Sequence, residues 1–173
     1  MSDRSDNLLV TLIERLTLLI GVIASGLTFC MVLMVVVIVV LRYAFDAGFI
    51  GLQEGLVWMH AAVFMLGAAY TLKEDEHVRV DIFYRKMSPG RKAWVNAIGV
   101  LIFVFPLSAF LFIESLDYVS AAWRIREISR DTGGLPYPAI PLLKSMLLAM
   151  PILVGLQGLA ILLRSIATLR SPR

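Results

Sequence analysis

The chain has 173 residues, of which 59% are hydrophobic and 17% are charged, and its mean hydropathy is +0.83. This composition excludes a water-soluble globular domain, a disulfide-rich secreted domain and a disordered chain. The net charge of +3 does not indicate nucleic-acid binding, because the cations lie beside apolar runs rather than on one basic face. The single cysteine, Cys30, allows neither a disulfide nor a thiolate metal site within one chain.

Four stretches of the sequence lack Asp, Glu, Lys and Arg, and each is long enough, or nearly so, to cross a hydrocarbon core of about 30 Å as a helix. They are Leu16–Leu41, Gly55–Leu72, Ala93–Ile113 and Ser145–Leu163. The pattern predicts an all-α integral membrane protein, a single domain over residues 1–173 with spans at about 16–41, 55–72, 93–113 and 145–163. The first run is too long for the core of a signal peptide, so we expect an uncleaved span.

The basic residues are distributed unevenly between the connections. Eleven of the 16 Lys and Arg residues lie in the N-terminal segment, in residues 73–92 and in the C-terminal segment, and five lie in the other two connections. By the positive-inside rule, both termini are expected to face the cytoplasm (N-in, C-in). The first span is longer than an upright helix needs, which predicts strong tilt or an initial course along the interface.

The third span is predicted to begin with Ser88 as N-cap and Pro89 as the first helical residue. An apolar stripe continues past Ile113 to Trp123, so we expect this helix to extend beyond the membrane until Thr132-Gly133-Gly134 ends it. The return to the fourth span is predicted to be stiff and extended, because it contains Pro136, Pro138 and Pro141.

The predicted spans contain no Asp, Glu, Lys or Arg, whereas a transporter that moves an ion by itself usually carries such charges at mid-membrane. His60 is interpreted as a structural, hydrogen-bonded histidine rather than a proton relay. Haem ligation by two histidines within the spans is excluded, because His77, the only other histidine, lies in a charged loop. That run of charges is interpreted as solvated rather than metal-binding, and no serine has a nucleophile motif around it. We therefore predict no catalytic residue, no cofactor and no metal site, and a protein that is not an enzyme.

Several short motifs follow one another along the chain. They are Arg42-Tyr43 at the end of span one, Glu54 at the start of span two, Gly67-Ala68-Ala69, and Glu76-His77-Val78-Arg79-Val80-Asp81. This succession, with four spans, a basic loop after span two and a Pro-containing return to span four, resembles the DctQ-like small membrane subunit of tripartite ATP-independent periplasmic (TRAP) transporters.

The resemblance implies an importer of three parts in the bacterial cytoplasmic (inner) membrane: a soluble extracytoplasmic substrate-binding protein, a large membrane subunit and this small one. In that family the large subunit holds the sodium sites and the substrate path, and the small subunit extends its fixed scaffold. The expected function is therefore a non-catalytic scaffold in sodium-coupled import of an organic acid, with membrane lipid but no nucleic acid as a further partner. Two alternatives stay open, namely a membrane anchor subunit of a redox complex and a self-sufficient small exporter.

The candidate residues for helix pairing or a subunit interface are Arg42, Glu54, Gly67, His77 and Asp81. Arg42 and Glu54 bracket a short extracytoplasmic turn, so either they pair or Arg42 snorkels to lipid phosphate. His77 and Asp81 are an i, i+4 pair in an expected amphipathic helix on the cytoplasmic leaflet. Gly21 and Ser25 have a small-xxx-small spacing that would admit a close helix.

The segment Glu114–Lys144 is the longest extracytoplasmic connection, on the side where a binding protein would arrive. The resemblance makes Arg124, Arg126 and Arg130 candidates for docking that protein. Contacts of mixed charge on a rigid surface would suit a transient and salt-sensitive encounter.

Overall fold

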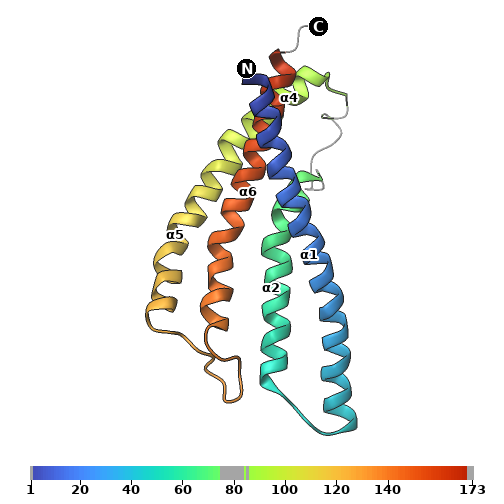
Figure 1. Ribbon diagram of the computed structural model, residues 1–173, viewed down its shortest axis with the longest axis vertical. Coiled ribbons are helices and arrows are strands. Elements are labelled where there is room, and N and C mark those ends of the chain that lie inside the picture. Colours follow the sequence, from blue (N-terminus) through green and yellow to red (C-terminus); the bar gives the residue numbers. More distant parts are fainter. Residues whose placement is uncertain (1, 75–83, 85, 171–173) are drawn as a thin grey trace.

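The structure of the chain is a computed structural model that describes residues 2–74, 84 and 86–170. Its elements are α1 (Ser2–Ala44), α2 (Ile50–Lys73), α4 (Pro89–Gly99), the π-helical turn η1 (Val100–Val104), α5 (Phe105–Arg124) and α6 (Ala139–Arg170). Because α4, η1 and α5 are continuous, the described chain forms four long helical rods (Figure 1). Each rod is long and apolar enough to cross a membrane. The prediction of an all-α protein with four spans is confirmed.

The four rods lie in one open layer rather than in a closed bundle, in the order α5, α6, α2, α1 (Figure 1). α6 packs against α5 on one side and α2 on the other, and α1 packs along α2. The start of α1 lies at the end of the layer that also holds α4, and α1 contacts α6 there. The first residues of α1 and the last of α6 therefore lie at the same end of the molecule (Figure 1). Which side of the membrane this end faces stays a prediction.

The rods are longer than the predicted spans at both ends. α1 has 43 residues and the α4–α5 rod has 36, which at about 1.5 Å per residue gives about 64 and 54 Å. Both lengths exceed a hydrocarbon core of about 30 Å. The prediction of a long first helix is thus confirmed, and the third rod continues past Ile113, the predicted end of its span, to Arg124.

The third rod begins where it was predicted, with Ser88 as N-cap and Pro89 in the first turn. Within it, the Phe105 N–H donates to the Val100 carbonyl, which is the i→i−5 bond of a π-helix. Pro106 follows at once and has no N–H to donate to an α-helical ladder. The wider π turn therefore lies where the proline interrupts the regular pattern.

The prediction that the third helix runs to Thr132 is wrong, because α5 ends at Arg124. Arg126 adopts a left-handed conformation with φ of 50°, and it donates its N–H to the Trp123 carbonyl at 3.2 Å. The Glu127 N–H donates to the Ala122 carbonyl at 3.0 Å. Together these bonds form a Schellman motif, a helix end that usually has glycine where this chain has arginine.

The return to the fourth span also ends earlier in the sequence than expected. α6 begins at Ala139, so Pro141 lies in the first turn of this helix and is fully buried there. A proline in the first turn breaks no hydrogen bond, because the N–H groups of that turn have no partner within the helix. Of the three prolines, Pro136 and Pro138 belong to the connection and Pro141 belongs to α6.

Candidate functional site

The connection between α5 and α6 is held against the start of α2 by a single carboxylate. Glu54 Oε2 accepts a hydrogen bond from the Leu135 N–H at 2.6 Å, and Glu54 Oε1 accepts one from the Ser129 hydroxyl. A Cβ on Gly134 would lie 2.8 Å from Glu54 Oε1 and would overlap the Ser129 side chain. Glycine at position 134 thus lets the backbone approach this carboxylate.

A second set of contacts fixes the same connection to α5 and α6. Lys144 Nζ lies 2.6 Å from Glu127 Oε2 and 4.0 Å from the centre of the Tyr118 ring. The Trp123 indole N–H donates to the Ser145 hydroxyl at 2.9 Å. The Trp58 indole of α2 donates to the Ala139 carbonyl at 3.0 Å. Residues 125–138 are therefore bound to α2 through Glu54 and to α6 through Lys144, where α6 is itself joined to α5 and α2.

The outward side of this connection carries the three predicted docking arginines. Arg124, Arg126 and Arg130 are all exposed, and Ile125 and Ile128 between them are 68% and 61% exposed. We call these five residues the loop face. Glu127 and Asp131 lie beyond the end of α5, and Glu127 binds Lys144.

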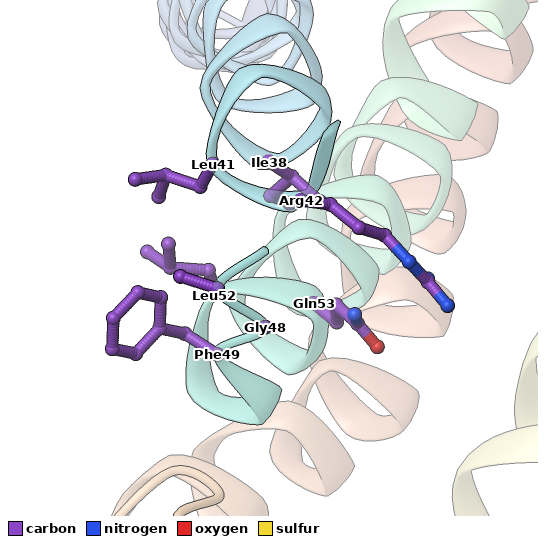
Figure 2. Close-up of a pocket in the computed structure, with 8 residues that line it drawn as sticks. Ile38, Leu41, Arg42, Gly48, Phe49, Leu52 and Gln53 are labelled. Carbon is purple, nitrogen blue, oxygen red and sulfur yellow. The ribbon is translucent and has the colours of Figure 1, made fainter. Parts of the chain in front are cut away.

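The structure does not bring Arg42 and Glu54 together. No ion pair among the described residues joins them, and both oxygens of Glu54 bind the α5–α6 connection. Arg42 and Gln53 point to one side of the α1–α2 turn, and Leu41, Phe49 and Leu52 point to the other (Figure 2). Arg42 is exposed there, which fits the snorkelling alternative.

At the opposite end, α1 and α6 are joined by polar contacts that the sequence analysis missed. Glu14 forms an ion pair with Arg164. One helical turn further into the membrane, Thr17 Oγ1 lies 3.1 Å from the side-chain oxygen of Gln157, and both residues are buried. A signal was present, because Glu14 and Arg164 each lie just outside an apolar run, and a glutamine within a span needs a partner.

The face formed by α1 and α2 has one close contact and one open groove. A Cβ on Gly21 would lie 2.7 Å from Cγ of Tyr70, so this glycine admits the tyrosine ring and the small-residue prediction for α1 is confirmed at Gly21. The groove has a volume of about 520 Å³ and includes Ser25, Thr28 and Gly67 in its lining. A Cβ on Gly67 would meet no atom within 4 Å. The predicted interface residue Gly67 thus faces open space in this chain.

His60 is exposed on α2, with Val57 and Phe64 near it on the same helix face. It lies about 15 Å along the helix from Ile50 at about 1.5 Å per residue. Within the described chain, His60 has no hydrogen-bond partner, so the expectation that it bonds to a neighbouring helix is not supported by these contacts.

Two of the five predicted interface residues, His77 and Asp81, lie outside the described residues, as does most of the predicted amphipathic helix. Among the described residues, no group of three or more His, Cys, Asp or Glu side chains is arranged to hold a metal ion. The polar contacts between distant segments of the described chain join helices and loops to one another.

These observations define a multi-pass α-helical membrane protein that forms one open layer of four rods. A comparison with protein families matches residues 31–171 to the DctQ component of tripartite ATP-independent periplasmic transporters. Since the match covers most of the chain, the protein belongs to this family and is the small subunit of a TRAP transporter, a component of the inner membrane. The family works with a large membrane subunit and a binding protein. No curated protein and no solved structure matches the chain significantly.

Proposed function

We propose that this chain is a non-catalytic scaffold subunit. It would extend the fixed part of the large membrane subunit during sodium-coupled, binding-protein-dependent import of an organic acid. Sodium and the organic acid would bind in the large subunit, and this chain would need no cofactor. Family membership supports the small-subunit role and favours it over a redox anchor or a self-sufficient exporter.

The observation that carries the scaffold role is the polar content of the open α1–α2 face. His60 is exposed on a helix that is apolar enough to cross the membrane, and the nearby groove contains Ser25, Thr28 and Gly67. Polar side chains and small residues at mid-membrane are typical of helix–helix interfaces and are unfavourable against lipid. We therefore place the large subunit against this face, with Gly67 at the point of closest approach.

Reconstitution tests the division of roles. Liposomes that contain this chain alone should show no substrate uptake when the binding protein, substrate and a sodium gradient are supplied. Liposomes that also contain the large subunit should take up substrate, and the large subunit alone should show less uptake or none. Uptake by this chain without the large subunit would refute the scaffold role.

The loop face is proposed as the part of this chain that meets the binding protein. Its arginines are exposed, while the backbone beneath them is fixed by Glu54, Glu127 and Lys144. A surface that is already ordered loses little conformational entropy on docking. Exposed charges at its rim would mainly raise the rate of association and make it sensitive to salt.

A further inference from the structure

A pocket at the end of the molecule that holds both termini has features of an anion site. It has a volume of about 370 Å³ and lies between the end of α2, the start of α4 and the end of α6. Its lining includes Lys73, Pro89, Lys92, Asn96, Arg164 and Ser165. Three cations thus reach one pocket from three different helices.

Carboxylates compensate two of these cations. Lys73 Nζ lies 2.6 Å from Glu74 Oε1, and Arg164 pairs with Glu14 of α1. Lys92 has no carboxylate partner in the described part of the chain, and its Nζ lies 5.2 Å from the centre of the Tyr84 ring. Among the described residues at the pocket, three positive charges face two negative ones.

The start of α4 lies beside the pocket, because Pro89 of its first turn is part of the lining. Its N-cap, Ser88, makes no side-chain capping hydrogen bond, and the first backbone bond of the turn runs from the Lys92 N–H to the Ser88 carbonyl at 3.0 Å. Within the contacts described for this chain, the N–H groups of Gly90 and Arg91 have no acceptor. Unpaired N–H groups at the positive end of a helix favour an anion.

The position of the pocket suggests the source of that anion. Lys73 ends one membrane-spanning helix and Pro89 begins another, so the pocket lies at the level where lipid headgroups meet the hydrocarbon core. Leu72, Ala93 and Ile161 give it an apolar side. Inorganic phosphate would use only the polar side, whereas a phospholipid would use both.

We propose that this pocket binds the phosphate group of an anionic membrane phospholipid, with Lys92 as its main contact, Lys73 and Arg164 beside it, and the positive end of α4 close by. The bound lipid would join the ends of α2, α4 and α6. This site is independent of the scaffold role, because it needs neither the large subunit nor substrate.

The test uses the full chain, purified in mild detergent and mixed with equal amounts of phosphatidylglycerol and phosphatidylcholine. Native mass spectrometry then measures the lipid that stays bound. The chain should retain phosphatidylglycerol preferentially. Lys92→Gln should lower this retention about fivefold, since a cation near anionic lipid contributes about 1 kcal/mol, and the double variant Lys73→Gln/Lys92→Gln should lower it further. Lys92→Arg, which keeps the charge, should retain most of the binding and shows that the variant site is still folded.

Lys86→Gln is the matched control, because Lys86 is exposed and does not line the pocket. Equal losses in Lys86→Gln and Lys92→Gln would mean diffuse charge attraction and would overturn the site. Equal retention of the two lipids by the unchanged protein would overturn it too. A last arm adds inorganic phosphate without lipid. Binding of phosphate that depends on Lys92, with no preference for the anionic lipid, would assign the pocket to a soluble phosphate and overturn the lipid.

Discussion

At the scale of single residues, Glu54 determines how the α5–α6 connection lies on α2. An ionised carboxylate has only acceptor sites, and here each oxygen meets one donor, the Ser129 hydroxyl or the Leu135 N–H. Charge-assisted bonds of this kind are stronger than those between neutral groups. A residue that the sequence analysis associated with Arg42 thus organises a segment far along the chain.

Glu54→Gln should loosen this connection. The amide keeps the shape of the side chain, and it can accept from the Leu135 N–H and donate to the Ser129 hydroxyl, but both charge-assisted bonds become weaker neutral ones, at a cost of about 1 kcal/mol. In detergent, an added protease should therefore cleave residues 125–138 faster in the variant than in the unchanged protein. Glu114→Gln, which changes an exposed carboxylate on α5, should leave the cleavage rate unchanged.

A double-mutant cycle separates the two partners considered for Glu54. Glu54→Gln combined with Ser129→Ala should be clearly non-additive in the free energy of unfolding, because the two side chains share a hydrogen bond. Glu54→Gln combined with Arg42→Gln should be additive. Strong coupling to Arg42 and none to Ser129 would contradict the arrangement described here.

At the scale of helices, the contact of α1 with α2 depends on the missing side chain of Gly21. Gly21→Ala should weaken the packing of these two helices by about 1–3 kcal/mol, as overpacked sites do, because the new methyl group would lie 2.7 Å from Cγ of Tyr70. Thermal unfolding in detergent measures the loss. Adding Tyr70→Ala should recover part of it.

Gly26 supplies the control within the same helix. A Cβ there meets no atom within 4 Å, so Gly26→Ala should leave stability unchanged or raise it slightly through better helix propensity. If the two alanine variants lose the same stability, helix propensity or a change in lipid contact explains the result and close packing at Tyr70 does not.

The sequence was sufficient for the number of helices and for most of their course, because long apolar runs without charges have few other structures in lipid. It was insufficient where a single contact between distant segments determines how a connection lies. The choice of Ser129 and Leu135 over Arg42 as partners of Glu54 depends on where the chain turns after α5. In that turn Arg126 has a left-handed conformation. A glycine at this position would have predicted the end of the helix, but the sequence has none there. The pairs Glu14–Arg164 and Thr17–Gln157 could not be predicted for the same reason. They form only because α1 contacts α6, and the sequence does not give the order of the helices in the layer.

At the scale of the whole molecule, the loop face offers a test of docking. Reversing Arg124, Arg126 and Arg130 to glutamate should slow uptake that is delivered by the binding protein, by about tenfold or more at low salt and less at high salt. Copurification of the small and large subunits should not change, because these side chains are exposed and leave the contacts of Glu54 and Lys144 intact. Unchanged transport at every salt and binding-protein concentration would remove the loop face from the docking surface.

Orientation is a separate prediction for the whole molecule. The even number of spans places both ends of the described helices on one side (Figure 1), and the positive-inside count makes that side the cytoplasm. Alkaline phosphatase fused after residue 173 should be inactive, and green fluorescent protein at the same site should fluoresce. An active phosphatase fusion would reverse the topology and place the loop face away from any periplasmic protein.

The central place of α6 has a consequence for biosynthesis. Among the described helices, α1 and α2 are neighbours in the layer and can pair as soon as both have left the ribosome, whereas α4 and α5 pack against α6 and make no comparable contact with α1 or α2. α6 follows all of them in the sequence. The α4–α5 rod must therefore wait in the bilayer, surrounded by lipid or by a chaperone, until α6 is inserted. Assembly of the layer thus ends with a helix entering between two halves that are already in place.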